Sequence, residues 1–274
     1  MSDFADHLRV PGGSHVNIRS YLDRISYRVP AEPSDAGLLC ELHRAHMYSV
    51  PFENLDIGLG RTIVCDEACF LQKIVGERRG GFCYEINGAF AALLRALGFD
   101  VTTLSARVSR ADGSEGPEFD HMALLVNLEQ PWLADVGFGD SFVEPLRMEI
   151  GGEQEQFGRS FRILQDGSRY RYEADLDGAW RPQYSFALQP RDLSEFAGMC
   201  HFHQTSPDSH FTQKSICSLA TAEGRITLSG DRFIETRTTS REERHVNADE
   251  RERILRDRFG ITLPARKPTE SANP

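Results

Sequence analysis

The chain has 274 residues, of which 40% are hydrophobic and 26% are charged. This composition is typical of a soluble globular protein, and the length allows two or three packed units that share interfaces. The formal net charge of −10 argues against a nucleic-acid or anionic-membrane partner. No apolar run is long enough to cross a bilayer, and MSDFADHLRV carries acids where a secretory signal needs basic residues. We therefore expect a cytoplasmic protein, either a monomer or a homodimer.

The first 99 residues are expected to form a helical bundle. Apolar side chains recur with the spacing of one helix face, and Asn17, Ser34 and Asp66 are candidate N-caps for three helices. A fourth helix is predicted to begin near Cys83 and to end at Gly98, because glycine suits a helix C-terminus. This bundle, over 1–99, is the first of three predicted units.

From residue 100 the apolar spacing changes from the helical period to the alternation of strands, with Asp-Gly turn pairs between some of them. Residues 100–189 therefore predict an antiparallel β-barrel. Residues 190–263 predict a smaller α/β lid with a short helix over 191–196, three strands, and a helix over 247–259. The run EERHVNADERER is expected to be a solvated charge run, and the tail over 264–274 to be disordered. The predicted fold class is α+β.

The stretch RRGGFCYEINGAFAALLRALGF places Cys83 after two glycines and directly before the apolar helix. A sulfur at a helix N-terminus lies near unpaired N–H groups and the positive end of the dipole, which lowers the pKa of a thiol. Gly80 and Gly81 leave room for another backbone or a substrate. The alternative is a packed, inert cysteine, because the six cysteines form no disulfide framework or zinc pattern. This stretch alone supports both interpretations equally.

A histidine and an aspartate flank a predicted hairpin turn in FDHMALLVNLEQPWLADVGFG, residues 119–139. A turn centred near Leu128 pairs His121 with Asp135, and directly opposed residues have Cβ atoms roughly 4.5–5.5 Å apart. A carboxylate inside an apolar strand needs a partner, and an imidazole beside it can act as a base. Cys83, His121 and Asp135 are therefore a candidate nucleophile, base and orienting carboxylate. No local spacing rule fixes the contact between Cys83 and His121.

Several segments resemble the arylamine N-acetyltransferase family, in the expected order and over most of the chain. They are RGGFCYEIN (79–87), VPFENLDI (50–57), HMALLV followed by WLADVGFG (132–139), and the region from QTSPDSHF to EGRITLSG (204–230). The resemblance implies a helical bundle, a β-barrel and an α/β lid around a papain-like or transglutaminase-like core, with Cys83, His121 and Asp135 as the triad. It also implies ping-pong transfer of an acetyl group from acetyl-CoA to the nitrogen of an arylamine or arylhydrazine, through an acetyl-cysteine.

Further site residues follow from the resemblance. Arg79 and Glu53 match charged positions that brace the active-site loops. The candidate CoA contacts are Phe202, Asp208, Ser209, Phe211, Gly137 and Gly139, and the candidate wall for the flat acceptor ring is Phe82, Phe119 and Phe138. Two residues depart from the family pattern: Asp208, whose carboxylate would repel a pyrophosphate, and Asp120, directly before His121. These departures bear on the CoA pose and leave the triad intact.

Other histidines and other functions remain as alternatives. His43 with His46, and His201 with His203, lack a matching ligand set, so we expect no metal. A CoA-independent thiol hydrolase would share the triad, and a non-catalytic acyl-CoA or small-molecule binding protein would share the scaffold. A further variant keeps the enzyme but uses another acyl-CoA donor or serves biosynthetic amide formation. CoA dependence and a covalent adduct on Cys83 separate these possibilities.

Overall fold

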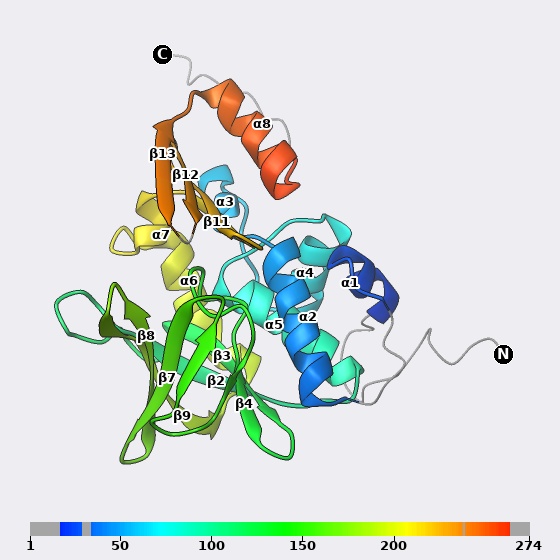
Figure 1. Ribbon diagram of the computed structural model, residues 1–274. Helices are drawn as coiled ribbons and strands as arrows, with labels where there is room; N and C mark the ends of the chain where they lie inside the picture. The colour runs from blue at the N-terminus through cyan, green and yellow to red at the C-terminus, as the bar shows by residue number, and fades with distance from the viewer. Residues whose placement is uncertain (1–16, 29–33, 238, 264–274) are drawn as a thin grey trace.

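The computed structural model describes residues 17–28, 34–237 and 239–263, so the predicted tail lies outside the described residues. Figure 1 shows helices gathered around α5, a large curled sheet, and a smaller sheet with α8 beside it. Within the described ranges, no helix combines the length and the apolar character that a membrane span requires.

The N-terminal part is helical, as predicted. Its elements are α1 (Ile18–Arg24), α2 (Ala36–Ser49), α3 (Leu55–Leu59), α4 (Glu67–Leu71), the π-helical turn η1 (Gln72–Gly76) and α5 (Cys83–Ala96). The predicted N-caps Asn17 and Asp66 are confirmed. The prediction for Ser34 was wrong: Asp35 caps α2, because the Ser34 hydroxyl donates instead to the carbonyl of Leu97 at 2.5 Å. Helix α3 was not predicted.

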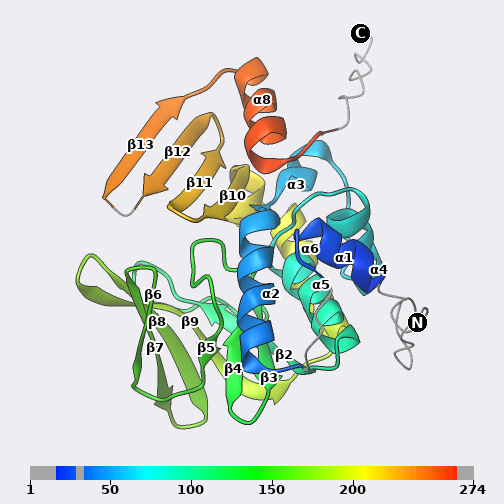
Figure 2. The ribbon, with the colours of Figure 1, turned by 45° about the vertical axis from the view of Figure 1, so that its right-hand side comes forward.

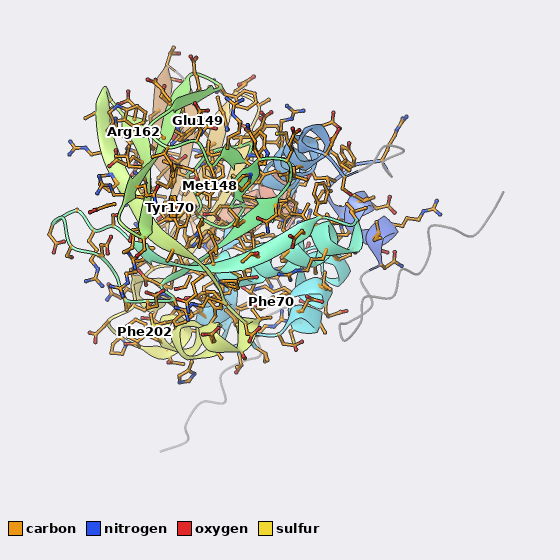
Figure 3. The ribbon with its side chains drawn as sticks, turned by 90° about the horizontal axis from the view of Figure 1, so that it is seen from below. Phe70, Met148, Glu149, Arg162, Tyr170 and Phe202 are labelled. Atoms are coloured by element: carbon orange, nitrogen blue, oxygen red, sulfur yellow. The ribbon has the colours of Figure 1, made fainter. Side chains whose placement is uncertain are left out.

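Helix α5 is the centre of this part, and 13 of its 14 residues are buried. Its apolar side chains pack against α4 and against the first strands of the barrel. Phe70 of α4, labelled in Figure 3, lies directly on Gly88, where a Cβ atom would come within 2.7 Å of the ring. Burial on every side fixes α5, and therefore Cys83 at its first position, in one place.

Eight strands form the barrel-like antiparallel sheet. They are β2 (Asp100–Val108), β3 (His121–Asn127), β4 (Pro131–Ala134), β5 (Leu146–Arg147), β6 (Glu153–Gln156), β7 (Arg159–Asp166), β8 (Arg169–Leu176) and β9 (Ala179–Pro190), in the order β5-β4-β3-β2-β9-β8-β7-β6. Alternate residues point inward to an aromatic-rich core, and Met148 and Tyr170 pack against it (Figure 3).

Two glutamine side chains join the edge strands β5 and β6. The amide of Gln154 accepts from Arg147 N at 2.8 Å and donates to Arg147 O at 2.9 Å. Gln156 accepts from the backbone N–H groups of Val143 and Glu144 and donates to the Glu144 carbonyl at 2.8 Å. These bonds satisfy edge backbone groups that would otherwise need a neighbouring strand.

The last part of the chain supplies the lid. After the 3-10 turn η2 (Leu193–Phe196) come α6 (Ala197–Thr205), α7 (His210–Gln213), β10 (Ile216–Thr221), β11 (Gly224–Ser229), β12 (Arg232–Arg237), β13 (Ser240–His245) and α8 (Ala248–Phe259). The lid sheet has the order β1-β10-β11-β12-β13, and its first strand, β1 (Phe52–Glu53), comes from the helical part. Figure 2 shows this sheet above the barrel.

Two lid predictions need correction. The short helix predicted over 191–196 continues as α6, because Cys200 and His203 bury one face of a longer helix. The charge run EERHVNADERER is largely exposed, as predicted, but its first part belongs to β13, a fourth lid strand that was not predicted and whose six residues are all exposed. Its last part lies in the predicted helix α8. An exposed edge strand carries no apolar alternation, so its sequence resembled a solvated loop.

Candidate active site

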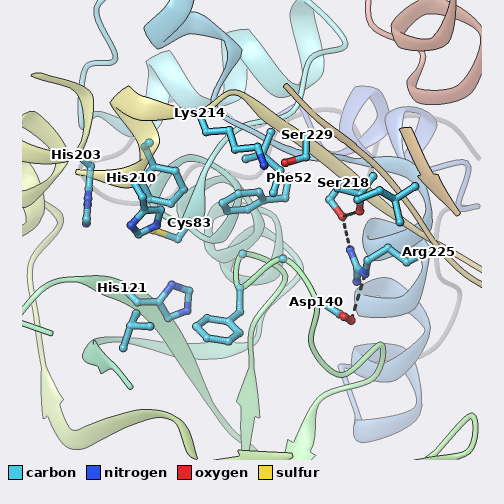
Figure 4. Close-up of a pocket in the computed structure, with 18 of the residues that line it drawn as sticks. Phe52, Cys83, His121, Asp140, His203, His210, Lys214, Ser218, Arg225 and Ser229 are labelled. Carbon is cyan, nitrogen blue, oxygen red and sulfur yellow. Dashed lines mark hydrogen bonds and ion pairs between the residues drawn. The ribbon is translucent and has the colours of Figure 1, made fainter. Parts of the chain in front are cut away.

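Cys83 is the first residue of α5 and lines a cavity of about 690 Å³. The cavity lies between the start of α5, the barrel and the lid sheet. Figure 4 shows the Cys83 sulfur and the His121 imidazole on the same side of this cavity. Cys83 and His121 therefore line the same cavity, which no spacing rule in the sequence could establish.

His121 contacts Asp135 directly, with its Nε2 atom 2.7 Å from Oδ2. The Nδ1 atom is consequently the nitrogen left for the cavity and Cys83. The predicted hairpin register was wrong by two residues, because Leu124 pairs with Ala134 and Asp135 follows the end of β4. An even shift keeps both side chains on one face, which is why the predicted contact is still made.

Buried donors hold the Asp135 carboxylate from several sides. Its Oδ1 atom accepts from Asn87 Nδ2 at 2.8 Å and from Gly137 N at 2.9 Å. Burial alone raises the pKa of this carboxyl, but the charge and hydrogen bond of His121, with the Asn87 and Gly137 donors, bring it below its ordinary value. Asp135 is therefore an anion that stabilises a positive charge on His121.

His43 of α2 supports the same aspartate through the backbone. The Asp135 N–H donates to His43 Nε2 at 3.1 Å, so His43 Nδ1 carries the proton and donates to Val143 O at 2.7 Å. Burial lowers the pKa of His43 to about 4, which keeps this ring neutral. His43, for which the sequence analysis expected only that it binds no metal, is thus a second support of Asp135.

Burial raises the pKa of the Cys83 thiol well above its ordinary value, and the carboxylates of Asp135 and Asp120 act in the same direction. The expected lowering by the helix N-terminus was wrong for the isolated thiol, because loss of solvation outweighs it. Release of the proton to water is therefore unfavourable. The Asp135 carboxylate contacts the His121 ring and can stabilise a positive charge there, so His121 is the candidate acceptor of the Cys83 proton.

Arg79 and Glu53 belong to a buried ion network beneath the start of α5. The guanidinium donates to Glu53 Oε1 at 3.0 and 2.7 Å, and it also lies 3.1 Å from Asp56. Lys73 contacts Asp56 at 2.9 Å and Glu85 at 2.8 Å. Glu85 in turn accepts from the Phe82 N–H at 3.1 Å and caps α5. The network joins η1, α3 and β1 to the residue before Cys83.

The cavity contains some of the other predicted site residues and not the rest. Those that line it are Gly137, Phe138, Gly139 and Phe211; those that do not are Phe82, Phe119, Phe202, Asp208 and Ser209. Phe82 is fully buried and Phe119 packs edge-on against Phe196. Phe202 lies on α6 (Figure 3), Asp208 is exposed, and Ser209 caps α7.

Sequence reasoning missed most polar residues of the cavity wall. On the side of His121, His203 contacts Asp120 Oδ1 at 3.2 Å and Ser209 Oγ at 3.2 Å. On the lid side, Lys214, Arg225 and Arg241 line the cavity together with serine and threonine hydroxyls. The available signal was the alternation of polar residues along the lid strands, which the sequence analysis used only to predict strands.

The described residues contain no cluster of three or more groups suited to hold a metal ion. His46 is buried against Phe90, and His201 is exposed.

Comparisons with known proteins point to one family. The sequence model of the N-acetyltransferase family matches residues 35–268. The arylamine N-acetyltransferase of Mycolicibacterium smegmatis is 34% identical, over 90% of this chain and 93% of the relative. The solved arylamine N-acetyltransferase from Salmonella typhimurium superposes with a TM-score of 0.85 at 31% identity, covering 92% of this chain and 93% of that one.

A second solved structure, the Mycobacterium marinum arylamine N-acetyltransferase in complex with CoA, gives a TM-score of 0.83 at 30% identity, over 89% of this chain and 92% of that one. The α+β fold class and the resemblance inferred from the motifs are both confirmed by these matches. The chain therefore belongs to the arylamine N-acetyltransferase family.

Proposed function

We propose that this chain transfers an acetyl group from acetyl-CoA to the nitrogen of an arylamine or arylhydrazine, through an acetyl-cysteine at Cys83. The observation that carries the proposal is the shared cavity of Cys83 and His121, with Asp135 bonded to the far side of the ring. Relatives named arylamine N-acetyltransferases, one of them solved with CoA, supply the donor and acceptor classes.

In the first half-reaction, His121 Nδ1 takes the Cys83 proton as the sulfur attacks the thioester carbonyl carbon. A new carbon–sulfur bond forms to Cys83, the bond to the CoA sulfur breaks, and the departing sulfur takes the proton back from His121. Asp135 stabilises the imidazolium between these events. The backbone N–H of Cys83, at the first helical position, is our candidate donor to the tetrahedral oxyanion.

In the second half-reaction, the amine nitrogen attacks the acetyl carbon of the thioester. The carbon–nitrogen bond forms, the bond to Cys83 breaks, and the amine proton passes through His121 to the sulfur. The enzyme returns to its starting protonation state, and the overall exchange releases CoA and an N-acetyl product. The sulfur is suited to this role because a thioester is activated towards amines yet transfers slowly to water.

The cavity wall supports a division of contacts between the two substrates. Phe138, which packs edge-on against His121 with ring centroids 5.1 Å apart, is a wall for the acceptor ring. Gly137 and Gly139 line the cavity, so their backbone can approach the CoA arm, and Phe211 lines the same cavity. The roles of Phe82, Phe119, Phe202, Asp208 and Ser209, like the three unit boundaries, stay predictions. So do the cytoplasmic location, the absence of a nucleic-acid partner, and the monomeric or homodimeric state.

Intact-protein mass spectrometry after mixing with acetyl-CoA tests the proposal. One acetyl group is expected on the protein, absent in Cys83→Ala, and discharged when an aromatic amine is added. Cys69→Ala, which removes an exposed cysteine outside the cavity, should still be labelled. If acetyl-CoA leaves no adduct while a peptide thioester or amide does, the thiol hydrolase alternative replaces the transferase. Comparison with longer acyl-CoA donors would identify a different donor preference.

A further inference from the structure

The segment directly before His121 is held in an unusual backbone conformation. Phe119 has a φ of 66°, in the left-handed region that a non-glycine residue rarely adopts. Its N–H donates to Ser105 Oγ at 2.8 Å, and its carbonyl accepts from the Tyr84 hydroxyl at 2.7 Å. A strained conformation persists only where the surrounding contacts hold it. The position of His121, two residues later, therefore depends on the contacts that hold this segment.

His203 of the lid helix α6 holds the next residue, Asp120, at two points. Its Nε2 atom lies 3.2 Å from Asp120 Oδ1 and 3.3 Å from the Asp120 carbonyl oxygen. Its Nδ1 atom lies 3.2 Å from Ser209 Oγ. Because Nε2 faces two acceptors, it carries a proton whether the ring is neutral or charged, and it donates to Asp120. His203 is only 3% exposed, so packing and these contacts fix its ring.

The Asp120 carbonyl is a point where three elements meet. Tyr84, which follows Cys83 directly on α5, places its hydroxyl 3.3 Å from this oxygen. His203 reaches the same oxygen from α6, and β3 begins at the next residue, His121. Loss of the His203 contact would therefore affect both the helix that carries the candidate nucleophile and the strand that carries the candidate base.

His203 is also the charge partner of the Asp120 carboxylate. Among the described residues, no other side chain makes an ion pair or a hydrogen bond with this carboxylate. Burial first, and His203 second, lower the pKa of the nearby His210 below 6.5, so His210 stays neutral near pH 7 and cannot replace His203. Asp120 lines the cavity with Cys83, and its charge adds to the burial that raises the pKa of that thiol. An Asp120 released from His203 would oppose loss of the Cys83 proton more strongly.

We propose that His203 is a positioning residue for acetyl transfer. From the lid it holds Asp120, and through Asp120 it fixes the start of β3, which carries His121. The same contact offsets the Asp120 charge beside Cys83. The proposal rests on the proposed function, since it concerns the same nucleophile and base. Figure 4 shows His203 on the same side of the cavity as Cys83 and His121, with Arg225 on the other.

The pH at which the Cys83 thiolate forms should report this contact. The titratable groups around Cys83 and Asp120 are Tyr84, His121, Asp135, Cys200, His203 and His210. The same cavity also holds Asp140, Lys214, Arg225 and Arg241. The variants below change only the pair of Asp120 and His203, so a shift between their pH profiles is assigned to that pair.

Alkylation of Cys83 by iodoacetamide, followed by peptide mass spectrometry over a range of pH, measures how much thiolate is present. His203→Leu should move the midpoint of this profile to higher pH. It should also slow acetylation of Cys83 by acetyl-CoA about tenfold, because a hydrogen bond to a charged group is lost. His203→Gln, whose amide nitrogen can still donate to Asp120, should recover most of both losses.

Asp120→Asn separates the charge from the contact. The asparagine oxygen can still accept from His203 Nε2, but the negative charge is gone, so the midpoint should move to lower pH than in the wild type. This variant also tests the proposal if urea unfolding shows that His203→Leu does not fold. The matched control is His201→Leu, on the same helix but exposed and outside the cavity, which should change neither the midpoint nor the rate.

A folded His203→Leu protein with the wild-type midpoint and rate would overturn the proposal. Slow acetylation with an unshifted midpoint and no recovery in His203→Gln would also overturn it, because His203 would then only pack the lid. An unshifted midpoint in Asp120→Asn would do the same, because Asp120 would exert no charge on Cys83. Failure of the proposed function is a separate outcome: the wild type would take no acetyl group from acetyl-CoA, and the alkylation profiles would still decide the role of His203.

Discussion

Asn87 lies one helical turn after Cys83 on α5, and its amide donates to Asp135 at 2.8 Å. The helix that carries the candidate nucleophile therefore also holds the carboxylate that contacts the candidate base, His121. The same amide accepts from Val136 N at 2.9 Å and donates to Met122 O at 2.6 Å. Asn87 thus links β3 and the residues that follow β4 to the helix.

Replacement of Asn87 by alanine should weaken both fold and catalysis. Three buried groups lose their partner, so the free energy of unfolding should fall by about 1–3 kcal/mol. Loss of the Asn87 donor also raises the pKa of Asp135, because this bond is one of those that lower it. The acid limb of the acetylation rate should therefore move to higher pH. Asn127→Ala, which removes only an exposed amide bond to Asp100, should change neither quantity.

Two histidines of α2 should respond in opposite ways to replacement by leucine. His46 is buried, and neither ring nitrogen has a hydrogen-bond partner among the described residues. His46→Leu should therefore raise the free energy of unfolding by about 1 kcal/mol. His43→Leu removes two hydrogen bonds, to Val143 and from Asp135, and should lower it by about 1–3 kcal/mol.

The increase in the free energy of unfolding caused by His46→Leu should become larger as the pH falls. Burial lowers the pKa of His46 well below its ordinary value of 6.5. Below pH 6.5 the His46 ring is protonated in the unfolded chain but stays neutral in the folded chain. This histidine therefore lowers the free energy of unfolding progressively as the solution becomes more acidic. Urea titrations of wild type and variant between about pH 7 and about pH 5 measure this difference. If the difference in the free energy of unfolding between variant and wild type does not change with pH, the lowered pKa of folded His46 is wrong.

Gly137→Ala should disturb the catalytic cavity. A Cβ atom at this position would lie 2.5 Å from Asn87 Nδ2 and 3.0 Å from the Cα and carbonyl oxygen of Cys83. The start of α5 is buried and cannot move away, so the added methyl group would displace Cys83 or the loop that carries Gly137. The rate of Cys83 acetylation should therefore fall by about tenfold or more. Gly198→Ala on α6, where a Cβ atom meets nothing within 4 Å, should leave the rate unchanged. A fully active Gly137→Ala enzyme would show that the loop can yield.

Glu85 should make the free energy of unfolding fall as the pH rises towards neutral and above. Burial raises its pKa from 4.5 to about 7, although Lys73 opposes this effect. Between these values the folded chain binds more protons than the unfolded chain. The contribution of Glu85 is therefore complete below pH 4.5 and is lost as the pH rises through 7. Glu85→Gln should gain in stability relative to wild type from about pH 5 to about pH 8, as measured by urea unfolding.

The control for Glu85→Gln is Lys73→Met, which removes the cation shared by Asp56 and Glu85. It should destabilise the fold by about 3–5 kcal/mol, because buried carboxylates lose their partner. If Lys73→Met is as stable as the wild type, the ion network does not support the start of α5.

The candidate triad could be predicted from sequence because two local patterns tolerate small errors in register and in helix boundaries. A two-residue slip of the hairpin register leaves His121 and Asp135 on one face, and the apolar helix after Gly81 locates Cys83 at its first turn. The meeting of helix and hairpin depends on packing between α5 and β3, which are distant in sequence. Family resemblance, not periodicity, supplied that contact.

The rest of the cavity depends on tertiary geometry that local patterns do not encode. Phe82 was expected to face the acceptor, but as the N-cap of α5 it turns into the core against Tyr84. His43 was indistinguishable from a packing histidine, because its partner Asp135 lies 92 positions away. In the sequence, nothing distinguishes Arg225 from other strand residues. Only the pairing of β10, β11 and β12 places it beside Ser218 and Thr236.

The glutamine bridge between β5 and β6 has a consequence for how copies of this chain meet in concentrated solution. An exposed strand edge is a template on which a second chain can add by hydrogen bonding, and this is a common start of aggregation. Here the Gln154 and Gln156 amides already occupy the edge groups of Glu144 and Arg147. A strand from a second chain would first have to displace both side chains. The two glutamines therefore block pairing at this edge of the barrel without a further strand.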